Sequence, residues 1–225
     1  MTNTDVFTTL KTNLGESLKL DEPLSLNTNF KIGGPAKYFF TAHTTDELVH
    51  AIQVADELKL QFIILGGGSN VLVSDSGFPG LVVQARNNKW SIDDKRVTAE
   101  AGVSLGFLVQ KTVSAGLTGF EPLVAVPGTV GGAVYGNAGL PQASRGFIGD
   151  WVQEVVVCRD DKIIHVPVDE CNFSYRESVF KHNQDIILSV VFDLETGPAE
   201  TSQELLKKYI GARKGQPYNL PSSGC

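Results

Sequence analysis

Apolar residues that recur every three or four positions predict helices in the first third of the chain. The first helix lies near the start, where this pattern runs from Phe7 to Leu18. The second covers residues 44–58, and its beginning matches a capping box in which Thr44 caps the helix and Glu47 reaches back toward it. Both helices are expected to bury one apolar face.

Two more helices are predicted farther along the chain. Residues 104–115 carry the third, and Gly116 ends it because glycine adopts the left-handed conformation that closes many helices. A second capping box, formed by Thr201 and Glu204, opens the fourth helix, which we expect to end near Arg213.

Short apolar runs between turn-forming residues predict strands. These runs cover residues 37–42, 61–65, 71–73, 80–84, 96–100, 151–158, 162–166 and 185–194. The sixth and seventh runs are separated by Arg159, Asp160 and Asp161, which indicates a hairpin. Helices and strands together place the chain in the α+β class.

Two glycine-rich segments interrupt this pattern. Residues 128–139 contain five glycines in twelve positions, so we predict neither a stable helix nor an ordinary strand there. Gly66, Gly67 and Gly68 directly follow the strand predicted at 61–65. Such runs suit a backbone that comes close to a phosphate or a flat ring. Two of them, about sixty residues apart, suggest one large cofactor held from two sides.

The first glycine loop has two open interpretations. The N–H groups from Gly66 to Asn70 can converge on a pyrophosphate without any basic side chain, or the residues can form a tight turn only. The loop is not a dinucleotide fingerprint, because residues 71–73 are expected to continue as a strand. It is not a P-loop either, since no lysine follows the glycines.

Three further features carry possible chemistry. Arg176 stands among aromatic and apolar residues, where it can stack on a ring, grip a carboxylate or stabilise an oxyanion; a surface ion pair with Glu177 or Glu170 is the alternative. Cys225 is either a thiol acid or an exposed residue. Residues 27–34 taken by themselves indicate a surface loop.

Composition narrows the function classes. The 225 residues carry a net charge of −6, which argues against binding nucleic acid or an anionic membrane. The apolar run at 186–192 is far too short to span a bilayer. Three widely spaced cysteines form no disulfide framework, residues 1–20 lack a secretion signal, and the four histidines have no metal-ligand spacing. We therefore expect a cytoplasmic protein without a metal.

Taken in order, these segments resemble the UDP-N-acetylenolpyruvoylglucosamine reductase family, a family of flavoenzymes. The resemblance covers about residues 26–225, nearly the whole chain. The segments that carry it are Asn27-Thr28, Ile32-Gly33-Gly34, residues 65–73, 126–133, 137–139 and 175–181, Gln216-Pro217 and residues 221–225. Each segment alone is weak evidence, but their order along the chain is specific.

The resemblance implies an FAD-binding fold of the vanillyl-alcohol-oxidase (PCMH) type. Residues 1–25 would form an N-terminal helix and lead-in, 26–95 and 96–196 two α/β subdomains that clasp non-covalent FAD, and 197–225 the start of a substrate-binding domain. The implied FAD-binding residues are Asn27, Thr28, Gly33, Leu65, Gly66, Gly67, Gly68, Ser69, Asn70, Pro127, Gly128, Thr129, Gly131, Gly132, Ala133, Asn137 and Gly139.

The resemblance also implies a reaction. FAD would carry a hydride from NADPH to the enolpyruvyl group of UDP-N-acetylglucosamine-enolpyruvate, giving UDP-N-acetylmuramate for peptidoglycan and hence cell-wall synthesis. Arg176 stands at the position of the family's catalytic arginine and would stabilise the enolate, with Tyr175 and Arg176 binding the substrate. Cys225 replaces the family's proton-donating serine, and a thiol is the stronger acid.

One departure from the family bears on activity. The family continues beyond this proton donor into a region that carries a catalytic glutamate, so we expect the chain to be C-terminally incomplete and to lack that residue. A non-catalytic FAD-binding fragment and another oxidoreductase of the same FAD fold remain as alternatives. We expect a monomer whose small-molecule partners are NADPH and the enolpyruvyl sugar nucleotide.

Overall fold

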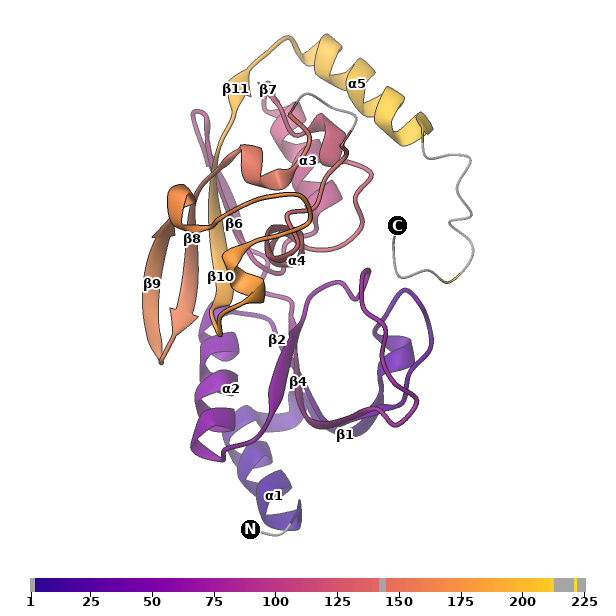
Figure 1. Cartoon of the computed structure of the whole chain (residues 1–225), viewed down its shortest axis with the longest axis vertical. Helices are drawn as coiled ribbons and strands as arrows, with labels where there is room; N and C mark the ends of the chain where they lie inside the picture. Colours follow the sequence, from indigo (N-terminus) through magenta and orange to yellow (C-terminus); the bar gives the residue numbers. More distant parts are fainter. Residues whose placement is uncertain (1–2, 142–144, 213–220, 222–225) are drawn as a thin grey trace. The chain divides into compact units, whose positions relative to one another are not determined.

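The structure is a computed structural model that describes residues 3–141, 145–212 and 221. The chain forms two compact units that divide between Asn87 and Asn88 (Figure 1). In the described ranges, no helix has both the length and the apolar character needed to cross a bilayer.

The first unit is a four-stranded sheet with helices on one face. The strands lie in the order β1-β2-β4-β3, with β1 antiparallel to β2 and the other neighbours parallel. The elements are α1 (Asn3–Leu14), β1 (Leu18–Pro23), β2 (Pro35–Ala42), α2 (Thr45–Glu57), β3 (Phe62–Leu65) and β4 (Phe78–Ala85).

The two faces of this sheet are covered differently. Helix α2 packs on β2 and β4 and buries Leu48, Ala51 and Ile52. The other face carries a cluster of apolar residues against which loop residues pack; its buried members are Leu24, Ala36, Phe39, Leu65 and Val82, and its loop residues include Val71 and Val73. The segments at 24–34 and 66–77 therefore form a loop layer on the face opposite α2.

Most predicted elements of this unit are confirmed, with three differences. The first helix ends at Leu14, and Leu18 begins a strand instead of continuing the helix. The strand predicted at residues 71–73 is wrong: this segment has no regular structure, and Leu72 is 68% exposed. Thr44 caps α2 by accepting the N–H of Glu47 at 3.1 Å, but the Glu47 carboxylate accepts the N–H of His43 (2.7 Å) rather than that of Thr44.

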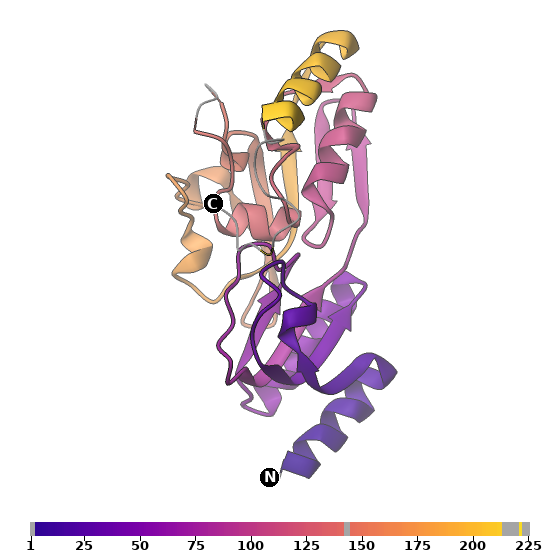
Figure 2. The ribbon, with the colours of Figure 1, turned by 90° about the vertical axis from the view of Figure 1, so that its right-hand side faces the viewer.

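The second unit is built on a five-stranded antiparallel sheet in the order β5-β6-β10-β8-β9. Helix α3 packs near the two-stranded β7–β11 pair and also contacts α5 (Figure 2). The elements are β5 (Trp90–Asp93), β6 (Arg96–Glu100), α3 (Leu105–Ser114), β7 (Leu117–Thr118), α4 (Val130–Tyr135), β8 (Val152–Arg159), β9 (Lys162–Pro167), β10 (Ile186–Asp193), β11 (Glu195–Thr196) and α5 (Ala199–Ala212).

The core of the second unit is centred on a group of aromatic rings. The ring of Phe120 meets the rings of Trp151 and Phe192 edge to face, with centroids 5.5 and 5.0 Å apart. Apolar residues of α3, α4 and the sheet surround this group. Short 3-10 turns join the elements of both units, at Gly15–Ser17, Leu24–Leu26, Glu121–Leu123, Ile148–Asp150, Val168–Glu170 and Val179–Lys181.

The hairpin predicted in this unit is confirmed, and so is the third helix with Gly116 beyond its end. Asp160 and Asp161 turn the hairpin with φ of +48° and +59°, as a two-residue turn with left-handed central residues requires. The capping box at Thr201 is wrong, because α5 begins at Ala199, two residues before the predicted cap. Strand β5 was not predicted.

The glycine-rich segment at 128–139 also differs from the expectation. Residues Val130–Tyr135 form α4 despite two glycines, so the prediction that no helix can form there is wrong. The reason is packing: Gly131 lies so close to Ala101 that an added Cβ would stand 2.7 Å from the Ala101 Cβ. Close approach to the core thus outweighs the low helix propensity of glycine.

Candidate functional site

The candidate residues fall into two groups, one in each unit. Asn27, Thr28, Gly33 and residues 65–70 lie in the first unit. The second unit contains Pro127, Gly128, Thr129, Gly131, Gly132, Ala133, Asn137, Gly139, Tyr175 and Arg176. Cys225, the predicted proton donor, lies outside the described residues, as do Gln216, Pro217 and residues 222–224.

In the first unit, the glycine loop packs directly on the segment that begins at Asn27. Gly68 has φ of +65°, and a Cβ on it would lie 2.2 Å from the Asn27 carbonyl oxygen and 2.9 Å from the Thr28 Cα. The N–H of Asn29 donates to the Gly68 carbonyl at 2.9 Å. Only glycine fits this position, because any side chain would push the two segments apart.

Gly33 makes a similar contact at the other end of this segment. Its φ is +116°, and an added Cβ would lie 2.5 Å from the Cβ of Val73. Residues 27–34, which by themselves indicate only a surface loop, therefore pack on the glycine loop at Gly68 and on Val73, three residues beyond it. Four separately predicted residues, Asn27, Thr28, Gly33 and Gly68, belong to one loop layer.

This layer contains backbone donors that the rest of the unit leaves available. Among the residues that the structure describes, the N–H groups of Gly67, Gly68 and Asn70 donate to no backbone carbonyl and no side chain. The loop follows the carboxyl end of β3, as the sequence predicts. Successive free N–H groups in a glycine turn form the anion-binding arrangement that such loops use for phosphates.

Two buried side-chain atoms in the first unit also have no hydrogen-bond partner among the described residues. They are the Thr28 Oγ1 and the Gln84 Nε2. Thr28 is a predicted cofactor residue, whereas sequence reasoning missed Gln84. The available signal was a single amide inside the otherwise apolar run Leu81-Val82-Val83-Gln84-Ala85.

In the second unit, the start of α4 is held by its own neighbours. Thr129 precedes the helix, and its hydroxyl accepts the N–H of Gly132 at 3.5 Å, a long and weak contact. The N–H groups of Val130 and Gly131 donate to the carbonyls of Val103 and Ala101, both at 2.9 Å. Two of the amides in this segment therefore serve packing, and its role toward a cofactor stays a prediction.

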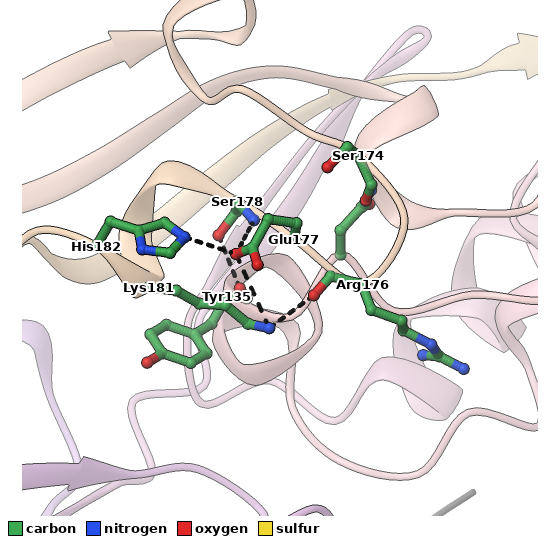
Figure 3. A network of polar contacts seen from close by, with 8 residues as sticks. Tyr135, Ser174, Arg176, Glu177, Ser178, Lys181 and His182 are labelled. Atoms are coloured by element: carbon green, nitrogen blue, oxygen red, sulfur yellow. Dashed lines mark hydrogen bonds and ion pairs between the residues drawn. The ribbon is translucent and has the colours of Figure 1, made fainter.

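Arg176 stands in a tight, strained turn. Ser174 and Glu177 exchange backbone hydrogen bonds of 3.2 and 3.1 Å across it, and Arg176 has φ of +56°. A non-glycine residue in this left-handed region is unfavourable, and such strain gathers at functional positions. Figure 3 shows the guanidinium of Arg176 directed away from the polar network formed by the neighbouring side chains.

Three hydrogen bonds fix this turn to the rest of the second unit. The Asn137 side-chain amide donates to the Ser174 carbonyl at 2.7 Å, and the buried Ser178 hydroxyl donates to the Tyr135 carbonyl at 2.7 Å. The Lys181 ammonium donates to the carbonyl of Arg176 itself at 2.6 Å. Asn137 and Tyr135 adjoin the end of α4, so the structure brings two predicted segments together (Figure 3).

The Glu177 carboxylate is engaged by other groups than Arg176. Its Oε1 accepts the N–H of Ser178 at 3.0 Å, and lies 3.1 Å from His182 Nε2 and 3.9 Å from Lys181 Nζ. The Ser178 N–H, followed by the charges of Lys181 and His182, lowers the pKa of Glu177. Arg176 forms no salt bridge with any described residue, which disfavours the surface ion pair with Glu177 or Glu170.

A cavity of about 500 Å³ lies beside this turn. Asn137 and Tyr175, predicted for the cofactor and for the substrate, both line it, and Tyr175 is 69% exposed. The other lining residues are Phe147, Gly149, Asp150, Val168, Asp169, Asn172, Phe173 and Ser174. The Tyr175 and Phe147 rings meet edge to face with centroids 5.8 Å apart, which holds the tyrosine at the rim.

Comparisons with known proteins give the fold and the family. Residues 36–166 match the family described as FAD binding domain. In the solved structure of UDP-N-acetylenolpyruvylglucosamine reductase from Thermus caldophilus, 72% of the chain is matched by 92% of this one, with a TM-score of 0.76 and 33% identity. A structure of p-cresol methylhydroxylase is similar in fold, at a TM-score of 0.66 and 15% identity over 87% of this chain and 44% of that one.

Relatives found by sequence carry the same reductase name as the solved structure from Thermus caldophilus. A UDP-N-acetylenolpyruvoylglucosamine reductase from Pseudothermotoga lettingae is 35% identical over 92% of this chain and 71% of its own length. The reductase from Clostridioides difficile is 32% identical over 100% of this chain and 74% of its own length.

Together with the mixed α+β architecture, these matches define a flavoprotein with the FAD-binding fold of the PCMH type, which confirms the predicted fold class. Within that class, the chain belongs to the UDP-N-acetylenolpyruvoylglucosamine reductase family, a family of oxidoreductases. The match of sequence and fold confirms the resemblance predicted from the sequence.

Proposed function

We propose that this chain binds FAD and uses it to reduce the enolpyruvyl group of UDP-N-acetylglucosamine-enolpyruvate with NADPH as the electron donor. The product would be UDP-N-acetylmuramate, a precursor of peptidoglycan. Membership of the reductase family supports this assignment. A cytoplasmic monomer remains the expected form.

The residues of the first unit fit an FAD diphosphate. Gly67, Gly68 and Asn70 have N–H groups that donate to no described residue, and Gly68 has no side chain to separate the loop from Asn27. The Thr28 hydroxyl is buried without a partner in the described chain, as expected of a group whose acceptor is a ligand. We assign Asn27, Thr28, Gly33 and residues 65–70 to FAD binding, and the predicted residues at 127–139 remain part of the proposal.

FAD, when bound, would supply the redox chemistry: it would take up a hydride from NADPH and pass it to the enolpyruvyl methylene carbon of the substrate. The protein's task is to hold the substrate carboxylate and to stabilise the negative charge that develops beside it. Arg176 suits both tasks, because its fixed positive charge is presented from a constrained turn and is paired with no described carboxylate.

Two further residues have proposed roles. Tyr175, exposed at the rim of the cavity, would contact the substrate beside Arg176. Cys225 would deliver the proton that quenches the enolate carbon, because a thiol with a pKa near 8.5 is a stronger acid than the serine alcohol of the family. Its placement lies outside the described residues, so this role rests on the sequence.

The observation that carries the proposal is the Arg176 guanidinium, which forms no salt bridge with a described residue and stands on a strained, tethered turn. The test follows the flavin absorbance of the FAD-loaded chain in two anaerobic steps: reduction by NADPH, then reoxidation by the enolpyruvyl sugar nucleotide. Arg176→Gln is expected to keep the first step and slow the second by about a hundredfold or more, the typical loss for a missing oxyanion donor.

Other results distinguish the alternatives. A chain that retains FAD but reacts with neither NADPH nor the sugar nucleotide would be a non-catalytic FAD-binding fragment. Oxidation of an alcohol in place of reduction of the enolpyruvyl group would indicate another oxidoreductase of the same fold. Equal slowing of both steps in Arg176→Gln would contradict the role given to the arginine.

A further inference from the structure

Two buried polar atoms of the first unit lack a partner among the described residues: the hydroxyl oxygen of Thr28 and the amide nitrogen of Gln84. The two residues are only 6% and 5% exposed. Burying a donor without an acceptor is unfavourable, and native proteins rarely retain such groups without a reason. Thr28 already has a proposed role toward FAD, whereas Gln84 has none.

The backbone places Gln84 on the loop-covered face of its sheet. Val82 and Gln84 are two residues apart in β4, so their side chains point to the same face. Val82 belongs to the apolar cluster that the loop layer covers, and so does Leu65, the residue opposite Gln84 in β3. Leu65 immediately precedes the Gly66–Asn70 loop.

The available groups on this face are donors. The Gln84 Nε2 carries two N–H bonds, and the Thr28 hydroxyl can donate one. Gly67, Gly68 and Asn70 add backbone N–H groups that have no acceptor in the part of the chain that the structure describes. Thr28 lies against Gly68, so these donors come from neighbouring segments. A set of donors without a matching acceptor suits a ligand that is rich in acceptor oxygens.

We propose that Gln84 is a further FAD-binding residue, whose buried amide Nε2 donates a hydrogen bond to the ADP half of the cofactor. This inference rests on the proposed function and adds a residue that neither the motifs nor the glycine loops point to. It also accounts for an amide inside an apolar strand: the group is kept for the ligand and not for the fold.

The test is Gln84→Met in the full chain, because methionine has a similar length and no donor. FAD affinity is measured by quenching of flavin fluorescence, and the melting temperature is measured without cofactor. We expect the dissociation constant for FAD to rise about tenfold to a hundredfold. The cofactor-free variant should melt at or above the wild-type temperature, since an unsatisfied buried amide has been removed.

A matched control is Gln61→Met, which makes the same change at an exposed glutamine of the same unit and should alter neither quantity. An FAD affinity within twofold of wild type in Gln84→Met would overturn the inference. So would a lower melting temperature of the cofactor-free protein, because the amide would then serve the fold.

ADP competition tests which half of the cofactor is involved. The inhibition constant of ADP against FAD should rise in Gln84→Met by the same factor as the dissociation constant for FAD, and an unchanged constant would overturn the assignment to the ADP half. If the wild-type chain binds FAD and Gln84→Met binds it equally well, only the role of Gln84 is refuted. A wild-type chain that binds no FAD refutes the proposed function and this inference together.

Discussion

The hydroxyl of Ser178 donates to the carbonyl of Tyr135 at 2.7 Å, across 43 positions of the sequence. Ser178 follows the Arg176 turn directly, and Tyr135 is the last residue of α4. Ser178 is buried, so its hydroxyl has no ready access to water in place of this carbonyl. The orientation of the arginine turn therefore depends on the glycine-rich helix (Figure 3).

Ser178→Ala should weaken this connection. Removing the hydroxyl deletes this part-buried hydrogen bond, which we expect to cost about 0.5–1.5 kcal/mol of unfolding free energy. Reoxidation of reduced flavin by the enolpyruvyl substrate should slow, while the affinity for FAD stays close to wild type. Urea unfolding and the two-step absorbance assay measure these effects. Ser114→Ala, at an exposed serine of α3, is the control. If Ser178→Ala has the stability and the reoxidation rate of wild type, the hydrogen bond between Ser178 and Tyr135 is dispensable.

Lys181→Met should remove a second hydrogen bond that holds the Arg176 turn. The ammonium donates to the Arg176 carbonyl at 2.6 Å, and methionine keeps the length of the chain without the donor. We expect the turn to lose part of its left-handed preference, so that the reoxidation step slows several-fold and reduction by NADPH does not.

A conservative substitution tests whether a charged donor at this position is what holds the turn. Lys181→Arg keeps both the donor and the positive charge and should restore most of the rate. If Lys181→Met reacts at the wild-type rate in both steps, Lys181 does not position the turn.

Gly68→Ala should disrupt the first unit and its cofactor site together. The new Cβ would meet the Asn27 carbonyl at 2.2 Å, in addition to the strain of a left-handed alanine, which is about 1 kcal/mol. Gly15→Ala is the matched control, because Gly15 has a similar φ of +73° and open space around its Cα. We expect Gly15→Ala to show the strain alone in urea unfolding, and Gly68→Ala to lose more stability and most FAD binding.

The raised pKa of the Cys171 thiol predicts how the stability of the folded protein depends on pH. Burial, with a smaller contribution from Glu170, raises the pKa of this thiol from 9.0 to about 12. The folded protein therefore holds the proton that the unfolded chain releases, so stability is fully present below pH 9 and declines as the pH rises toward 12. The melting temperature of wild type should fall over this range, and part of that fall should be absent in Cys171→Ala. If the melting temperatures of wild type and Cys171→Ala fall equally with pH, the thiol does not contribute to the pH dependence of stability.

The sequence predicts more of the fold than of the site. Elements with a strong apolar period, such as the hairpin around Asp160 and Asp161, were found because local pattern and turn chemistry agree. Helix α4 was missed, since the contact between Gly131 and Ala101 that favours it is invisible in the local sequence. The same limit applies to Val71, whose apolar run lies in the loop layer that packs on the sheet and does not form a strand.

The site residues show the same division. Asn27 and Gly68 carry motifs and were predicted separately, but only the fold reveals that one excludes a side chain on the other. Arg176 was predicted from the family motif, whereas its left-handed φ and its three tethers depend on residues up to 43 positions away. Gln84 belongs to no motif and becomes visible only because its amide is buried without a partner.

Every described hydrogen bond that holds the Arg176 turn joins residues between Tyr135 and His182. The turn is thus assembled when the second unit folds, before any ligand is present. Less ordering entropy then remains to be lost when a negatively charged substrate arrives, and more of the binding free energy is available to lower the barrier. Inhibitors that present a rigid carboxylate should benefit from the same preorganisation, whereas flexible analogues lose their own freedom of motion on binding.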